Sequence, residues 1–85
     1  MSNILETVDL RVALNKVQKR SSEIVISEYF VKDSNEDYIF KNLNATCQLL
    51  EKESPALLKK LVEANSGKKL TLKQFHRVLI NVLNQ

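Results

Sequence analysis

The clearest periodic pattern lies at the C-terminal end of the chain. Apolar residues recur there at three- and four-residue spacing, which is the repeat of one helix face. They are Leu72, Phe75, Val78, Leu79, Val82 and Leu83. Thr71 and Gln74 have the spacing of a capping box, in which each side chain satisfies a backbone N–H of the other. The pattern therefore predicts an amphipathic helix over residues 72–84.

A second helix is predicted over residues 55–65. Ser54 stands where an N-cap is needed, and Pro55 takes the first helical position, where a missing N–H costs nothing. An apolar stripe follows, made of Leu57, Leu58, Leu61 and Val62. Gly67 lies just beyond, and a glycine suits the left-handed conformation that often ends a helix.

A third helix is predicted over residues 35–52. Its first turn holds Glu36 and Asp37, whose charges favour the positive end of the helix dipole. Its apolar stripe is Ile39, Phe40, Leu43, Cys47 and Leu50. Because Cys47 lies within this stripe, we interpret it as a small core side chain and not as a reactive group.

Residues 7–32 carry two competing patterns. An alternation typical of a strand runs through Val8, Leu10, Val12 and Leu14. Residues 23–26 include a β-branched run that also suits a strand. Residues 15–22, however, contain neither Gly nor Pro and are rich in good helix formers. We therefore predict helices, with breaks near residues 20–22 and 31–34, and keep an N-terminal hairpin as the alternative.

These patterns together predict an all-α fold, a small bundle of four to five helices in a single domain over residues 1–85. The alternative is an α+β fold with the hairpin at residues 7–32. One Gly and one Pro in the whole chain favour the helical fold, because hairpins usually need such residues at their turns.

Few side chains are suited to catalysis or to holding a cofactor. The chain has one cysteine, Cys47, and one histidine, His76, whereas a zinc site needs three or four such ligands. Nucleophilic catalysis needs a nucleophile beside a base, and a phosphate-binding loop needs several glycines. We therefore expect no enzyme, no catalytic residue, no metal and no cofactor.

The same composition indicates where the protein works. A single cysteine cannot form a disulfide within the chain, and small secreted domains usually depend on disulfides. This favours the reducing environment of the cytoplasm. No stretch approaches the ~18–20 apolar residues of a membrane span, so we expect no membrane association.

Charge is spread unevenly along the chain. The net charge is +3, but residues 1–42 hold six Lys/Arg and seven Asp/Glu, whereas residues 43–85 hold seven Lys/Arg and three Asp/Glu. The basic candidates for partner contact are therefore Lys59, Lys60, Lys68, Lys69, Lys73, His76 and Arg77.

A basic surface of this kind suits an acidic protein or a nucleic acid, or it is simply a solvated face. A helix-turn-helix is disfavoured, because the gap from Asn65 to Thr71 exceeds the roughly 3–4 residues of a DNA-binding turn. No aromatic residues alternate with the basic ones, as they would on a surface that stacks single-stranded bases. We therefore favour an acidic protein partner over nucleic acid.

The N-terminal segment has a second apolar face in its helical interpretation, formed by Leu10, Leu14 and Val17. We expect these residues to form a partner surface or a homo-oligomer contact. The predicted function is a non-enzymatic protein-interaction module, acting as a small regulator, adaptor or inhibitor. The alternatives are a nucleic-acid-binding protein and a toxin-neutralising immunity-type protein, the latter on likeness of size and charge alone.

Overall fold

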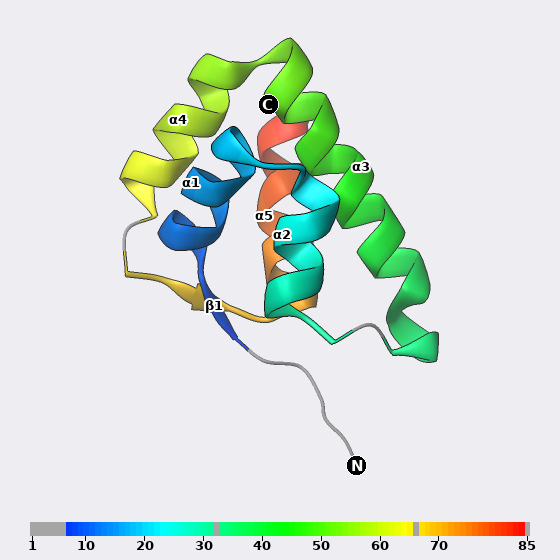
Figure 1. The fold of residues 1–85 in the computed structure, drawn as a ribbon. Helices are drawn as coiled ribbons and strands as arrows, with labels where there is room; N and C mark the ends of the chain where they lie inside the picture. Colours follow the sequence, from blue (N-terminus) through cyan, green and yellow to red (C-terminus); the bar gives the residue numbers. More distant parts are fainter. Residues whose placement is uncertain (1–6, 32, 66, 85) are drawn as a thin grey trace.

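The computed structural model describes residues 7–31, 33–65 and 67–84, and over these the fold is a helical bundle with one short two-stranded sheet (Figure 1). The elements in chain order are β1 (Val8–Asp9), α1 (Leu10–Lys19), α2 (Ser22–Tyr29), a 3₁₀ turn η1 (Ser34–Glu36), α3 (Asp37–Glu53), α4 (Pro55–Ala64), β2 (Lys69–Leu70) and α5 (Leu72–Leu83). The predicted all-α bundle is confirmed.

The three helices predicted in the C-terminal part of the chain form with small shifts at their ends. α3 begins at Asp37 and not at residue 35, because residues 34–36 form the 3₁₀ turn η1. The capping box of α5 is present: the Gln74 N–H donates to Thr71 Oγ1 at 3.4 Å, and the Thr71 N–H donates to Gln74 Oε1 at 3.0 Å. Local sequence signals therefore fix the beginning of this helix.

The hairpin alternative for residues 7–32 is wrong. Two helices, α1 and α2, occupy most of this segment, and the chain turns between them at Arg20 and Ser21. Asp9 begins α1 by accepting a hydrogen bond from the Arg11 N–H at 3.0 Å. The alternation that suggested a strand is accidental, since Val12 is 42% exposed whereas Ala13 is buried.

The small sheet joins two segments that are distant in the sequence. β1 pairs antiparallel with β2, with Val8 opposite Leu70 and Asp9 opposite Lys69. The Leu10 N–H also donates to the Lys68 carbonyl at 2.9 Å. The beginning of α1 is thus held close to the beginning of α5.

One hydrophobic cluster contains residues from all five helices. In α5, Leu72, Phe75 and Leu79 are fully buried, and the Phe75 ring meets Phe30 at a centroid distance of 5.9 Å and a tilt of 54°. Cys47 is also fully buried, and burial raises the pKa of its thiol to about 12. Cys47 is therefore protonated and packs as a small apolar side chain, as its place in the stripe predicted.

The structure corrects the prediction that Leu10, Leu14 and Val17 form a partner or self-association surface. Their exposed fractions are 0%, 0% and 1%, and all three belong to the hydrophobic cluster. The second apolar face of α1 is covered from within the chain, because α1 packs between α2 and α4. These residues contribute to the core and offer nothing to a partner while α1 stays packed.

Replacing Leu14 by alanine is expected to lower the free energy of unfolding by about 2–5 kcal/mol, because it leaves a cavity in the core. The matched control is Val12→Ala on the exposed side of the same helix, which should change stability by less than about 0.5 kcal/mol. Urea titrations followed by circular dichroism measure both values. Equal losses in the two variants would show that α1 is not rotated as described.

Replacing Thr71 by alanine is expected to lower the free energy of unfolding by about 1 kcal/mol, since the Gln74 N–H loses its acceptor. Thr71→Ser keeps the hydroxyl and should retain most of the stability. Thermal melts of the two variants provide the comparison, and indistinguishable melting temperatures would contradict the capping role.

Candidate interaction groove

The basic residues predicted as contacts lie on three parts of the structure. Lys59 and Lys60 lie on α4, Lys68 and Lys69 lie at β2, and the remaining three lie on α5. Lys59 lines a hollow between α1 and α4 together with Arg11 and Glu63, whereas the three α5 residues line a different one. The predicted basic residues therefore do not form one continuous site, because Lys59 and the three α5 residues line different hollows.

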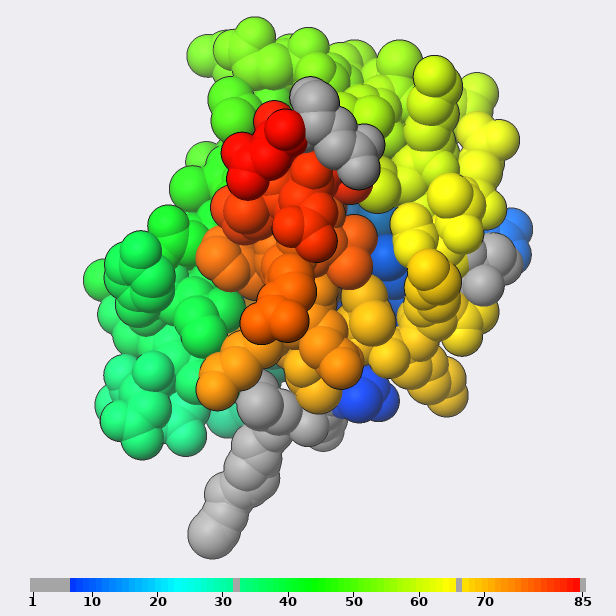
Figure 2. Space-filling view, turned by 180° about the vertical axis from the view of Figure 1, so that it is seen from behind, coloured from blue at the N-terminus to red at the C-terminus, as the bar shows by residue number. Residues whose placement is uncertain are grey.

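The three α5 residues share a groove with apolar side chains. This groove, called the α3–α5 groove here, has a volume of about 320 Å³ and is lined by Ile39, Lys73, His76, Arg77 and Ile80. α5 runs alongside α3 on this face of the molecule (Figure 2). Ile39 and Ile80 are both half-buried, so each offers part of its side chain to a ligand.

The cations of the groove differ in what they contact. Lys73 Nζ lies 3.6 Å from Glu36 Oε1, and the Glu36 side chain is only 11% exposed. This ion pair connects the first turn of α5 to η1 and offsets part of the Lys73 charge. Arg77 is exposed and has no ion pair within residues 7–31, 33–65 and 67–84. Arg77 is therefore the cation most available to a ligand.

His76 lies between Lys73 and Arg77 in the sequence, and its side chain is half-buried. Burial lowers the pKa of its imidazole from the usual 6.5, because a charged ring is poorly solvated there. The ring is therefore neutral near pH 7. Its Nε2 atom is buried and has no hydrogen-bond partner among the residues described, so it could bond to a group that enters the groove.

Two further apolar side chains of the same two helices are partly exposed, outside the residues that line the groove. α3 and α5 run in the same direction (Figure 1), so Leu49 and Leu83 lie toward the same end of the pair. Leu49 is 46% exposed and Leu83 is 36% exposed. By helical spacing, Leu83 shares a face of α5 with His76 and Ile80. The groove itself therefore combines the cations of α5 with the apolar side chains of Ile39 and Ile80, and Leu83 continues its α5 face.

Sequence reasoning found the cations of this groove and missed its apolar part. Ile39 was assigned to the buried stripe of its helix, but it lies at the edge of the core. The available signal was Ile80, which falls four residues after His76 and therefore on the basic face of its helix. An apolar residue on a basic face is typical of a contact surface.

The described part of the chain lacks two kinds of feature. No group of three or more His, Cys, Asp or Glu side chains in these residues is placed to hold a metal ion. None of the helices that the structure describes has the length and apolar character required to span a bilayer.

Comparison of the chain with models of known families found no match, and searches of curated proteins and of solved structures found no significant similarity.

The lowered pKa of His76 is directly measurable. We expect NMR titration of the imidazole C–H signals to give a value below 6.5 in the folded protein. The unfolded chain then takes up the proton at a higher pH than the folded chain does. The His76 contribution to the free energy of unfolding is therefore complete at neutral pH and is lost as pH falls through about 6.5 and below. A folded-state pKa at or above 6.5 would contradict the burial of this ring.

Proposed function

We propose that the chain is a non-enzymatic protein-interaction module that receives an acidic, amphipathic helical segment of a partner protein in the α3–α5 groove. A small regulator, adaptor or inhibitor works in this way. The observation that supports the proposal most is the presence of Ile39 and Ile80 in one groove with Lys73, His76 and Arg77. Such a groove is complementary to a ligand that is apolar on one face and acidic near one end.

The apolar residues suit a helix. An amphipathic helix docks by placing side chains at i, i+3, i+4 and i+7 into a groove between two other helices. Ile39, Ile80, Leu49 and Leu83 provide partly exposed apolar surface along α3 and α5. Burying this surface supplies affinity, at roughly 25 cal/mol for each Å² removed from water.

The charges suit an acidic segment. Arg77 lacks an internal ion pair in the described chain, and Lys73 keeps 64% of its side chain exposed beside Glu36. Lys73 lies in the first turn of α5, where the helix dipole also favours a negative ligand, and Arg77 lies one turn further along. The unpartnered His76 Nε2 adds a hydrogen-bonding group at the same end. Acidic side chains of the partner would therefore lie at this end of the groove.

Nucleic acid is the less well supported partner. Phosphates need cations but gain little from half-buried isoleucines, and four of the seven basic candidates lie outside the groove.

We also propose that the protein works in a reducing compartment. The fully buried, protonated Cys47 thiol needs no oxidising environment and forms no disulfide in the structure.

Selection from a library of random peptides displayed on phage tests the proposal. Wild-type protein is expected to enrich peptides that combine acidic residues with apolar residues at helical spacing. Fluorescence anisotropy then measures the dissociation constant of each enriched peptide. An Arg77→Glu/Ile80→Glu variant should bind about tenfold or more weakly, which corresponds to a loss of about 1.4 kcal/mol or more.

The matched control is Lys60→Glu/Lys68→Glu, which reverses two charges outside the groove and should change affinity by less than about twofold. Peptides that bind the groove variant as well as the wild type would contradict the proposal. So would a selection that enriches basic peptides or none. Tight binding of duplex DNA, with an affinity that falls steeply with salt and is lost in both variants, would favour the nucleic-acid alternative.

A further inference from the structure

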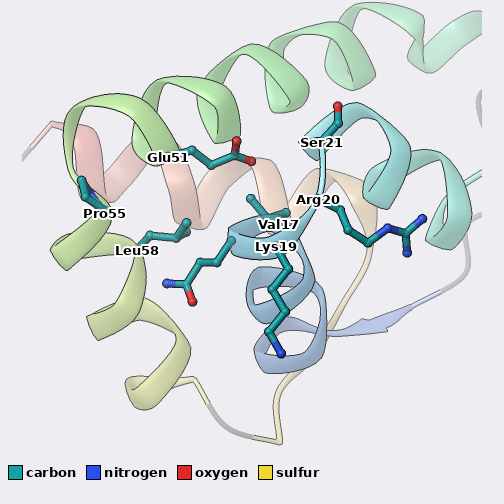
Figure 3. Close-up of a pocket in the computed structure, with 8 residues that line it drawn as sticks. Val17, Lys19, Arg20, Ser21, Glu51, Pro55 and Leu58 are labelled. Atoms are coloured by element: carbon teal, nitrogen blue, oxygen red, sulfur yellow. The ribbon is translucent and has the colours of Figure 1, made fainter.

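Another hollow lies on the other side of α3 from the groove, where α1 turns into α2. It has a volume of about 500 Å³, within the usual range of about 300–1,000 Å³ for small-ligand sites. Val17 and Leu58, each only 1% exposed, form its closed floor, and Pro55 provides an exposed apolar edge. Glu51 contributes a carboxylate to this hollow from the last turn of α3 (Figure 3). None of these residues belongs to the α3–α5 groove.

The Glu51 carboxylate is the unexplained group of this hollow. Its Oε1 atom is buried and has no hydrogen-bond partner within the described chain. A buried carboxylate oxygen without a partner is costly, so such an atom usually has an occupant that satisfies it. Burial also raises the pKa of Glu51 above its usual 4.5. A hydrogen-bond donor with positive charge would relieve this cost most effectively.

The cations at the rim of the hollow do not serve this purpose. In Figure 3 the side chains of Lys19 and Arg20 extend away from the Glu51 carboxylate, which points toward Val17. Arg20 is held by Glu28 through two hydrogen bonds of 2.6 and 3.0 Å. The interior of the hollow therefore presents an anionic acceptor, and its nearest cations are turned outward.

Helix ends add no net charge to the hollow. α1 ends at Lys19 and α3 ends at Glu53, but α2 begins just after Ser21 and α4 begins at Pro55, so two negative and two positive ends of helix dipoles lie close to it. The Glu51 carboxylate is therefore the group of the hollow that would attract a cation. Apolar surface beneath an anionic acceptor is complementary to an aliphatic chain that ends in an ammonium group.

We propose that this hollow binds an alkylammonium group, with its aliphatic part against the exposed edge of Pro55 and its nitrogen donating to Glu51 Oε1. The group comes from a lysine side chain of a partner or from a free small amine, which present the same chemistry. This site is separate from the groove, and it does not depend on the proposed function.

Titration of the ¹⁵N-labelled full chain with n-butylammonium chloride at pH 7.5, followed by amide NMR shifts, tests this site. Saturable shifts are expected at Val17, Gln18, Glu51 and Leu58, with a dissociation constant in the millimolar range for so small a ligand. n-Butanol has the same shape without the charge, so it should produce clearly weaker binding. N-acetyl-lysine methylamide presents the ammonium on a peptide backbone. If N-acetyl-lysine methylamide binds, the result favours a lysine side chain of a partner. If butylammonium binds and N-acetyl-lysine methylamide does not, the result favours a free amine.

Two variants separate the role of Glu51 from general negative charge. Glu51→Gln should weaken butylammonium binding about tenfold or more, because it replaces the anionic acceptor by a neutral amide. Glu53→Gln removes the same charge from the exposed end of α3 and should change the affinity by less than about twofold. The amide spectra report directly whether both variants are folded.

Binding should also follow the titration of Glu51. The other titratable groups around the hollow are Lys19, Arg20 with its partner Glu28, and the protonated thiol of Cys47 on α3. The affinity is expected to fall as pH drops through the raised pKa of Glu51, because the protonated acid no longer attracts a cation. Equal binding of butanol and butylammonium, unchanged affinity in Glu51→Gln, or no saturable shift with either cation would overturn the proposal.

Discussion

The packing of α3 is the constraint on which both candidate sites depend. Its stripe of Phe40, Leu43, Cys47 and Leu50 is buried in the common core, and this fixes the rotation of the helix about its own axis. One side of α3 then meets α5, and Ile39 enters the groove there. The opposite side meets α2, where the buried Ser22 hydroxyl donates to Asn44 Oδ1 at 2.9 Å. Glu51 follows Asn44 by two turns on that side, which places it over the corner between α1 and α2.

Contacts between the other elements fix the positions of α1, α2 and α5 relative to one another. β1 and β2 join the beginnings of α1 and α5, and the Phe30–Phe75 contact joins the end of α2 to α5. A chain of this length has a small core and a thin margin of stability, about 3–5 kcal/mol. It nevertheless leaves Ile39, Ile80, Leu49 and Leu83 partly open to solvent and one Glu51 oxygen unsatisfied. These partly exposed apolar side chains and the unsatisfied Glu51 oxygen are the features on which the two proposed binding sites rest.

The sequence was most informative where structure is local. The capping box at Thr71 and the proline at the beginning of α4 act within a few residues and formed as predicted, and the predicted stripe of α3 is buried apart from Ile39. The N-terminal segment was ambiguous because short apolar runs fit both the strand and the helix repeat. In the fold, α1 packs between α2 and α4, and this packing favours the helix over the strand. It also turns Leu14 into the core, so the surface predicted at that residue is buried.

The two sites could be foreseen only in part, because each combines residues from different elements. The basic residues of α5 were evident from composition, but their grouping with Ile39 depends on how α3 lies beside α5. Nothing in the sequence distinguishes Glu51 from the other acidic residues, and only the folded chain shows that its Oε1 atom is buried and that it lines a hollow with residues of α1 and α4. Sequence alone specifies which side chains a helix presents on each face, whereas the neighbour of each face is a property of the whole bundle.

The rotation of α3 can be tested most directly by methyl nuclear Overhauser effects in the isotopically labelled protein. The account predicts contacts between the methyl groups of Ile39 and residues of α5, and contacts of Leu50 with other core methyl groups. It predicts no contacts from Ile39 to α2. A spectrum in which Ile39 contacts Val25 or Ile26 of α2 would contradict the account, since the groove and the hollow would then both be wrongly placed.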